Sequence, residues 1–236
     1  MMVALGNFFF RTRNFIFPFA LLMVLLPGPR LAKSDLAAAL LGLAVTLAGQ
    51  LVRAGTIGLV YIVRGGKDRR VYANNLVTEG VFAHCRNPLY DGNLLIFAGM
   101  AITSNSWTSV LVMVPAALFV YRTIVAAEEN YLHGRFGTAF DEYCARVPRF
   151  LPDPSGIRET FAAMDFHWRR LVVKEYGTTF AWVTGWCAIV AYNLWRHDEL
   201  SVHPRLVAML QAVVAAAIVG WAVARYLKKS RRLVAD

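Results

Sequence analysis

The chain has 236 residues, of which 57% are hydrophobic and 17% are charged, with 25 basic side chains against 15 acidic ones. Soluble domains have roughly 45–50% apolar and about 25% charged residues, so this composition argues against an ordinary water-soluble globule and excludes a disordered chain. The net charge of +10 suits either nucleic-acid binding or the basic loops of a membrane protein, and the apolar content favours the second. We therefore expect the lipid bilayer as a partner and no nucleic acid. Three scattered cysteines have the spacing of neither a disulfide framework nor a zinc site: Cys85, Cys144 and Cys187.

Six stretches approach the length of about 20 apolar residues that a helix needs to cross a bilayer. They are residues 15–31, 36–63, 88–103, 107–125, 176–195 and 205–227. The first ends at Pro27-Gly28-Pro29 and follows two arginines, so it resembles a secretory signal peptide. Because Ala32-Lys33-Ser34 is a poor cleavage site and a second stretch begins at once, we expect an anchored first span. Ser104-Asn105-Ser106 predicts a tight helical hairpin between the third and fourth stretches.

The distribution of Lys and Arg predicts the orientation of these spans. With the N-terminus in the cytoplasm, 18 basic side chains fall on the cytoplasmic side, four on the other side and three within the spans. Cytoplasmic loops of membrane proteins carry such an excess. We therefore expect six spans with both termini cytoplasmic, in the plasma (inner) membrane of a prokaryote.

Two segments that do not span the membrane are expected on the cytoplasmic side. Residues 65–85 form a polar connection. After the fourth span, apolar residues recur at helical spacing until Pro148 ends the helix: Phe136, Phe140, Tyr143 and Val147. A second apolar stripe with basic flanks predicts a helix in the headgroup plane or a cap over the cytoplasmic face: Ile157, Phe161, Met164, Trp168 and Leu171.

Polar and charged side chains are concentrated at the ends of the third and fourth spans. Residues 80–92 lead into the third span, and Glu128 and Glu129 follow the fourth. One helical face carries Glu129, Leu132, His133, Phe136 and Phe140. Ionisable groups at membrane depth cost several kcal/mol unless they are paired, so this end of the hairpin is a functional candidate. The alternative is a set of interfacial charges that snorkel to water.

These residues carry a resemblance to a known family. Arg86-Asn87-Pro88-Leu89-Tyr90-x-Gly92, preceded by Gly80-Val81-Phe82, resembles the signature Arg-His/Asn-Pro-x-Tyr-x-Gly of integral-membrane methyltransferases. These are the isoprenylcysteine carboxyl methyltransferases and the related phospholipid methyltransferases. The second half of their pattern resembles Glu128-Glu129, Leu132, Phe136-Gly137, Tyr143 and the run Arg146-Val147-Pro148-Arg149-Phe150-Leu151-Pro152. Position 87 is Asn where many members have His, which keeps a hydrogen-bonding side chain and removes a titratable imidazole.

The resemblance, which covers residues 76–152, implies methyl transfer from S-adenosylmethionine, with S-adenosylhomocysteine as the product. It implies a catalytic role for Arg86 and Glu129, or for Glu128 in place of Glu129. The residues expected to bind the cofactor are His84, Asn87, Pro88, Leu89, Tyr90, Gly92, Leu132, His133, Phe136, Phe140, Tyr143 and Arg149. For each aromatic residue, plain helix packing is the alternative. No metal site is expected.

The predicted fold is all-α, a polytopic membrane helix bundle of about six spans with a cytoplasmic cofactor-binding segment after span four. We divide it into residues 1–75 (first two spans and basic loop), 76–152 (catalytic hairpin and cofactor segment) and 153–236 (interfacial helix and C-terminal hairpin). The final spans lie outside the motif and are candidates for substrate access or homo-oligomer formation.

Several alternatives stay open. Membrane reductases of sterol type, which bind a nicotinamide cofactor, resemble the same hairpin, and a non-enzymatic transporter or scaffold also fits the composition. The expected acceptor is lipophilic or lipid-modified: an isoprenylcysteine-like carboxylate, a phospholipid amine, another lipid group or a small hydrophobic thiol.

Overall fold

The computed structural model describes residues 1–59, 73, 75–198 and 200–234. Within these ranges the one β-bridge joins Arg30 to Ser106, so the predicted all-α class is confirmed. The elements in chain order are the helices α1 (Met2–Leu21), α2 (Asp35–Leu59), α3 (Pro88–Thr103), α4 (Trp107–Phe136), α5 (Thr138–Arg146), α6 (Ile157–Ala162), α7 (Trp168–Arg196) and α8 (Pro204–Lys229), with 3-10 turns η1 (Leu22–Leu25) and η2 (Gly80–Ala83).

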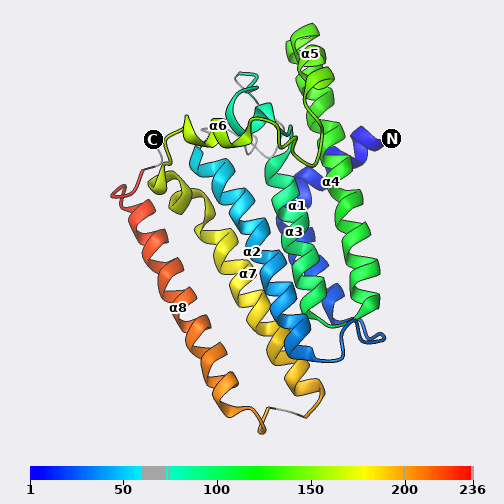
Figure 1. Ribbon diagram of the computed structural model, residues 1–236, viewed down its shortest axis with the longest axis vertical. Coiled ribbons are helices and arrows are strands. Elements are labelled where there is room, and N and C mark those ends of the chain that lie inside the picture. Colours follow the sequence, from blue (N-terminus) through cyan, green and yellow to red (C-terminus); the bar gives the residue numbers. More distant parts are fainter. Residues whose placement is uncertain (60–72, 74, 199, 235–236) are drawn as a thin grey trace.

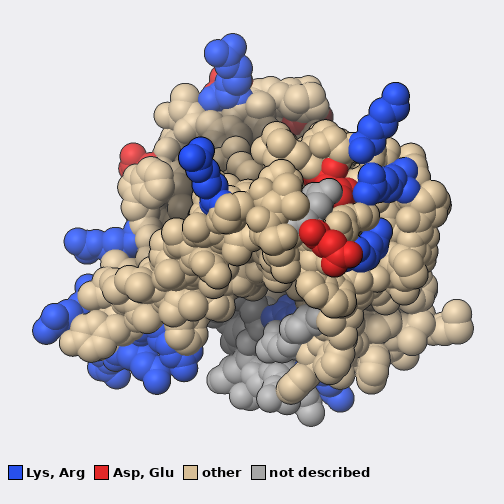
Figure 2. Space-filling model, turned by 90° about the horizontal axis from the view of Figure 1, so that it is seen from below, with Lys and Arg blue, Asp and Glu red and all other residues tan. Residues whose placement is uncertain are grey.

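The long helices lie side by side in one bundle (Figure 1). Helix α5 extends beyond one end of this bundle and α6 lies across the same end, where α1 begins and α8 finishes. Figure 2 looks at the opposite end, and uncharged residues make up most of the face in view. A buried apolar cluster joins η1, α3, α4 and α7 through Val24, Met100, Met113 and Ile189. The elements expected to carry the site are thus gathered at one end of the bundle.

Three helices, α2, α4 and α8, are long and apolar enough to cross a membrane. A fourth span is possible where Met2–Arg13 and Phe15–Leu25 meet at an angle of 81°. The remaining two expected spans correspond to α3, which has 16 residues, and α7, which has 29. Both run alongside the others in Figure 1. Three or four spans are therefore supported, and the number six stays a prediction.

The central hairpin is confirmed. Helix α3 occupies Pro88–Thr103, as predicted, and begins with proline at a position where its missing N–H is not needed. Ser104, Asn105 and Ser106 form the turn, in which Asn105 has a φ of 52° and the Ser106 side chain caps α4. Helix α4 then continues to Phe136, beyond its expected membrane end at residue 125.

Other predicted boundaries are wrong. Helix α1 begins at Met2 and includes Arg11 and Arg13, whereas its part after the 81° bend begins at Phe15, the expected start of the span. Gly137, with a φ of 52°, separates α5 from α4, so the face predicted to carry Glu129 through Phe140 is interrupted. The expected end of the second span at residue 63 and the basic residues Arg64, Lys67, Arg69 and Arg70 lie outside the described residues.

The stripe predicted between residues 157 and 171 is not one helix. Helix α6 ends at Ala162 and α7 begins at Trp168. The intervening segment packs against the end of α2, where the His167 amide donates to the Gly58 carbonyl at 2.8 Å. A Cβ atom on Gly58 would lie 2.3 Å from the Phe166 ring, so glycine is what lets that ring approach α2. The packing of Phe166 against Gly58 takes the place of a continuous helix between α6 and α7.

Helices α2 and α3 approach each other through paired glycines. A Cβ on Gly42 would lie 2.5 Å from the Gly99 carbonyl oxygen, and a Cβ on Gly99 would lie 2.5 Å from that of Gly42. The same reciprocal contact recurs one heptad away, where a Cβ on Gly49 would lie 2.5 Å from the Gly92 carbonyl. Small residues permit such close backbone packing between membrane helices. The pairing fixes the register that brings the end of α2 to the start of α3.

Gly99→Ala is expected to destabilise the bundle by about 1–3 kcal/mol, because the added Cβ would meet the Thr46 hydroxyl and also two backbone atoms of α2, the Gly42 carbonyl oxygen and the Thr46 nitrogen, which cannot rotate away. Gly220→Ala in α8 is the matched control, since a Cβ there meets nothing within 4 Å. Thermal unfolding in detergent, followed by circular dichroism, measures both. Equal melting temperatures for the two variants would contradict the close approach of α2 and α3.

Candidate functional site

Both halves of the predicted motif meet at an ion pair between Arg86 and Glu129. The Arg86 guanidinium lies 2.9 Å from the Glu129 carboxylate, and the two side chains are 12% and 15% exposed. Arg149 donates to the same carboxylate at 3.1 and 2.5 Å, and its own side chain is half exposed. Arg86 also contacts the Sγ of Cys144 in α5. A single glutamate thus sits between two arginines, one buried and one open to solvent.

The start of α3 positions Arg86 by binding the segment that follows α5. The Arg86 amide donates to the Pro148 carbonyl at 2.9 Å, and the Asn87 side-chain amide donates to the Arg149 carbonyl at 3.0 Å. The Asn87 side chain therefore binds the backbone that carries Arg149, and an amide makes this hydrogen bond without titrating. Pro88 then fixes the first turn of α3, so Arg86 is held where the chain enters the helix.

A buried contact between Cys85 and Asp91 strengthens the same junction. The Cys85 thiol donates to Asp91 Oδ2 at 3.1 Å, and the Leu151 amide donates to the same oxygen at 3.1 Å. Burial, together with the nearby Asp91 carboxylate, raises the pKa of the Cys85 thiol from its ordinary value of 9.0 to about 12. Cys85 is therefore a neutral hydrogen-bond donor and not a nucleophile.

Cys85 is expected to resist iodoacetamide in the native protein at pH 8. The thiolate is the reactive species, and the higher pKa lowers its fraction roughly a thousandfold at this pH. Mass spectrometry of the alkylated protein measures the modification, and the protein unfolded in sodium dodecyl sulfate supplies the reference rate. Alkylation of native Cys85 at the unfolded rate would contradict the buried contact with Asp91.

Glu128 and Glu129 face different surroundings, because adjacent helical residues point about 100° apart. Glu128 accepts a hydrogen bond of 2.8 Å from the Tyr90 hydroxyl, and both residues line a cavity of about 1150 Å³. Leu89 lines the same cavity. Residues of helices α1, α2, α3, α4 and α7 line it. The hairpin end therefore presents the Arg86–Glu129 pair and, separately, a Tyr90–Glu128 pair that faces the cavity.

The remaining predicted cofactor residues divide into four groups. His84 is buried, donates from Nδ1 to the Asp153 carbonyl at 3.0 Å and accepts from the Thr160 hydroxyl at 2.8 Å, which ties η2 to α6. His133 is exposed and lies 2.9 Å from Asp141. Gly92 packs against α2. An apolar cluster contains the others: Leu132, Phe136, Phe140 and Tyr143.

That apolar cluster holds α5 against the chain before α3. Phe140 and Tyr143 are each 4% exposed, and the Tyr143 hydroxyl donates to the Phe82 carbonyl at 2.8 Å. This burial supports the packing alternative for these two rings. Contact of any of the four residues with a cofactor stays a prediction.

The sequence did not predict the polar network that joins α2 to α7. Arg53 donates twice to Glu175, at 2.9 and 2.5 Å, and once to Asn93 at 2.5 Å. Gln50 donates to the same carboxylate at 3.3 Å and accepts from the Trp182 indole at 2.8 Å. The sequence did contain a signal for this network, because Gln50 and Arg53 are polar residues well inside an apolar stretch. Their partner Glu175 lies 122 residues beyond Arg53 and 125 beyond Gln50.

Comparison with known proteins matches residues 35–139 to the phospholipid methyltransferase family. The chain is 31% identical over 102 residues to the cobalt-zinc-cadmium resistance protein CzcN of Cupriavidus metallidurans, covering 43% of this chain and 44% of that protein. It is 31% identical over 80 residues to the nickel-cobalt-cadmium resistance protein NccN of Alcaligenes xylosoxydans xylosoxydans, covering 34% and 37% of the two chains.

The chain is also 28% identical over 116 residues to the protein-S-isoprenylcysteine O-methyltransferase B of Arabidopsis thaliana, covering 47% of this chain and 57% of that one. It thus spans between 37% and 57% of the length of these relatives. No solved structure matches it significantly. The matched segment runs from α2 to the start of α5 and contains Arg86 and Glu129. Residues 35–139 are therefore similar to the phospholipid methyltransferase family, and the chain has distant homology to the isoprenylcysteine O-methyltransferases.

Proposed function

We propose that this protein transfers a methyl group from S-adenosylmethionine to a lipophilic acceptor at the membrane. The observation that carries the proposal is the Arg86–Glu129 ion pair, because it joins the two halves of the motif at a distance of 2.9 Å. The match of residues 35–139 to the phospholipid methyltransferase family supports the reaction type, and the residue chemistry at the pair agrees with it.

The residues around this pair fit the cofactor. S-adenosylmethionine carries a carboxylate and an ammonium on its amino-acid portion, so a complementary site needs both signs of charge close together. Glu129 between Arg86 and Arg149 supplies that combination, and the half-exposed Arg149 is open to a ligand from solvent. When bound, S-adenosylmethionine supplies an activated methyl group on its sulfonium. Arg86 and Glu129 would then orient the amino-acid portion, which matters because methyl transfer depends on alignment more than on a strong base.

The Tyr90–Glu128 pair supplies the acceptor side of the proposed site. This pair faces the cavity, whereas Glu129 faces Arg86. The acceptor and the cofactor would therefore reach the end of the hairpin from different sides and react there. An acceptor carboxylate or thiolate is already a nucleophile, and Tyr90 would hold it by a hydrogen bond. An acceptor amine would require Glu128 to accept a proton.

We further propose that the hairpin end faces the cytoplasm, with six spans, both termini on that side, and the protein in the inner membrane of a prokaryote. The excess of basic residues supports this orientation. The placement of α5 and α6 at the end where α1 begins and α8 finishes is consistent with it (Figure 1). Helix α8 buries only Leu210 and Ala224 among its described residues, which leaves most of its surface for lipid or for a second copy of the chain.

Calorimetric titration of the purified protein with S-adenosylhomocysteine tests the cofactor assignment, with NADPH as the matched control. We expect micromolar binding of S-adenosylhomocysteine and no heat from NADPH. The opposite pattern would contradict the proposal and favour the reductase alternative.

A further inference from the structure

Arg53 lies directly against the first turn of α3, although it belongs to α2. A Cβ atom on Gly92 would meet the Cγ of Arg53 at 2.6 Å, so glycine at this motif position leaves room for the Arg53 side chain. Arg53 Nη1 donates to the Asn93 side chain at 2.5 Å and, more weakly, to the Leu89 carbonyl at 3.5 Å. Leu89 and Asn93 lie one helical turn apart, and Tyr90 lies between them. Arg53 therefore binds the turn that carries Tyr90.

Glu175 of α7 holds Arg53 in this place. Arg53 Nε and Nη2 donate to the Glu175 carboxylate at 2.9 and 2.5 Å, and the two side chains are 11% and 4% exposed. All three guanidinium nitrogens of Arg53 thus donate to groups of the protein itself. A bidentate contact fixes the plane of a guanidinium, and here that plane also determines where Nη1 meets α3. Although Arg53 lines the cavity, its donors are therefore committed to positioning α3 and not to binding a ligand.

The ring of Tyr90 is held through the same contacts. Asn93, which accepts from Arg53, also forms a side-chain hydrogen bond with Tyr121 of α4. The rings of Tyr121 and Tyr90 lie 5.1 Å apart, and Tyr121 is 1% exposed. The Tyr90 hydroxyl in turn donates to Glu128 at 2.8 Å. A continuous series of contacts therefore runs from α7 through α2 and α3 to the tyrosine that faces the cavity.

We propose that Arg53 and Glu175 are positioning residues for methyl transfer, which hold the first turn of α3 so that Tyr90 keeps its place at the reaction site. The inference rests on the proposed function for the role of Tyr90. It goes beyond that function by giving a part in the reaction to α7, which lies outside the matched residues 35–139. The rate of a reaction that depends on alignment can fall about 100-fold when the reacting groups are misplaced by about 1 Å.

The proposal separates turnover from cofactor binding. Arg86 is held by the Glu129 carboxylate and by the Pro148 carbonyl, and neither contact involves α2 or α7. Loss of the Arg53–Glu175 pair in a folded bundle is therefore expected to lower turnover and to leave the affinity for S-adenosylhomocysteine nearly unchanged. A purely structural role for the pair predicts that neither property changes as long as the bundle stays folded.

The double variant Arg53→Met, Glu175→Leu tests the proposal in a folded bundle, because replacing a buried ion pair by apolar residues is often neutral for stability. Turnover is measured as the incorporation of labelled methyl groups from S-adenosylmethionine into native membrane lipid. We expect turnover to fall about 100-fold relative to the wild type. We expect the Kd for S-adenosylhomocysteine, measured by calorimetry, to stay within about twofold of the wild type.

Fluorine NMR measures the position of Tyr90 directly. Tyr90 is replaced by 3-fluorotyrosine in the full chain, and the same label at Tyr226 in α8 serves as the reference. We expect the double variant to shift or broaden the resonance at position 90 and to leave the resonance at position 226 unchanged. This measurement needs neither acceptor nor cofactor, so it does not depend on the reaction.

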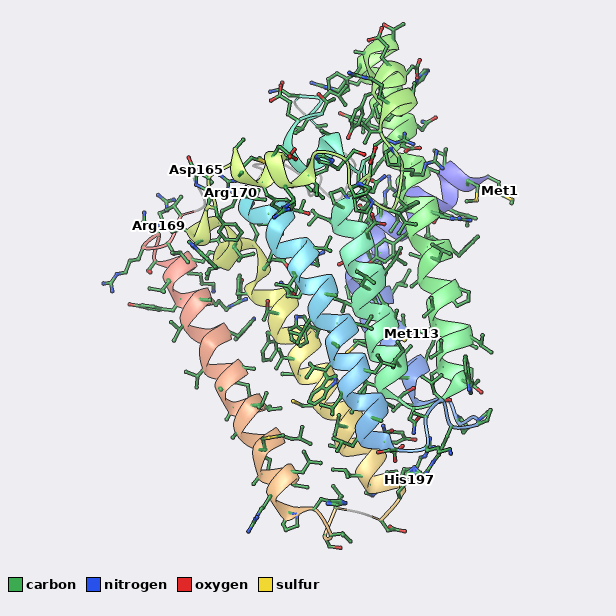
Figure 3. The ribbon with its side chains drawn as sticks, in the orientation of Figure 1. Met1, Met113, Asp165, Arg169, Arg170 and His197 are labelled. Atoms are coloured by element: carbon green, nitrogen blue, oxygen red, sulfur yellow. The ribbon has the colours of Figure 1, made fainter. Side chains whose placement is uncertain are left out.

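Asn193→Leu is the matched control, because it removes a buried hydrogen bond between α7 and α3 at the other end of the bundle. Asn193 is 5% exposed and donates to the Thr103 carbonyl at 2.9 Å. Figure 3 shows Arg170 at the end of α7 where α6 lies, and His197 at the opposite end. Glu175 is near the first of these ends and Asn193 is near the second. We expect this variant to keep wild-type turnover and the wild-type resonance at position 90.

Wild-type turnover in the double variant, or an unchanged resonance at position 90, would overturn the inference. A loss of S-adenosylhomocysteine affinity as large as the loss of turnover, or an equal loss of turnover in Asn193→Leu, would overturn it as well. Absence of methyl transfer by the wild-type protein overturns the proposed function and, with it, the role of the pair in turnover. A shifted resonance at position 90 would in that case still show that the ion pair positions Tyr90.

Discussion

Arg86→Ala is expected to abolish methyl transfer while the helix bundle stays folded. The substitution removes the guanidinium that holds Glu129 at 2.9 Å, and it keeps the backbone bond from residue 86 to Pro148. Loss of one preorganised electrostatic contact in an active site lowers kcat by about 100- to 1000-fold. Incorporation of labelled methyl groups into lipid extracts measures the rate, and circular dichroism checks the fold.

Glu129→Gln is expected to lower turnover to a similar extent. The amide is nearly the same shape but removes the charge that both Arg86 and Arg149 bind. Arg146→Ala is the matched control, because Arg146 is an exposed arginine of α5 whose Nε donates to the Glu142 carbonyl in the same helix. Wild-type turnover in both Arg86→Ala and Glu129→Gln would show that the reaction takes place elsewhere.

Glu175→Gln is expected to destabilise the bundle by about 3–5 kcal/mol, because it leaves the buried Arg53 guanidinium without its carboxylate. The side chains of Arg53 and Glu175 are 11% and 4% exposed, so solvent compensates little of the loss. Thermal unfolding in detergent measures the effect.

The double variant Arg53→Met, Glu175→Leu is expected to recover most of that stability, since replacing a buried ion pair by apolar residues is often neutral. Arg30→Gln is the control, because the Arg30–Asp35 contact is 3.9 Å long and Arg30 is half exposed, so its loss costs about 0–1 kcal/mol. A Glu175→Gln variant as stable as Arg30→Gln would contradict the burial of the network.

The fold was predictable where local signals agreed. Pro88 and the polar turn at residues 104–106 fixed both ends of α3, because each stops or starts a helix by its own backbone chemistry. The breaks at Gly137 and near His167 were not predictable. Near His167, continuation of a helix competes with the contact between Phe166 and Gly58, and at Gly137 the glycine adopts a φ of 52°; helical periodicity encodes neither.

The start of α7 shows a second limit. The apolar stretch begins at residue 176, yet the helix begins at Trp168 and includes Arg170, Lys174 and Glu175. Charges read along a sequence mark the end of a span, but Glu175 is buried here because Arg53 neutralises it. Only the packing of α7 against α2 reveals that these charges line a cavity.

The candidate site was also predicted from the sequence only in part. The resemblance grouped Arg86 and Glu129 at one end of the hairpin, and the structure brings them together with Arg149 and Asn87. It could not separate Glu128 from Glu129, because the two differ only in which side of α4 meets a neighbour. Helix α7 lies outside the motif, so its part in the cavity came from the structure alone.

The most direct test of methyl transfer uses tritium-labelled S-adenosylmethionine with the purified protein in native membrane lipid. The label is expected in the chloroform-soluble fraction, and its amount is expected to fall to the protein-free background with Arg86→Ala and to remain unchanged with Arg146→Ala. Label at background for the wild-type protein, or an equal amount with Arg86→Ala, would contradict the account.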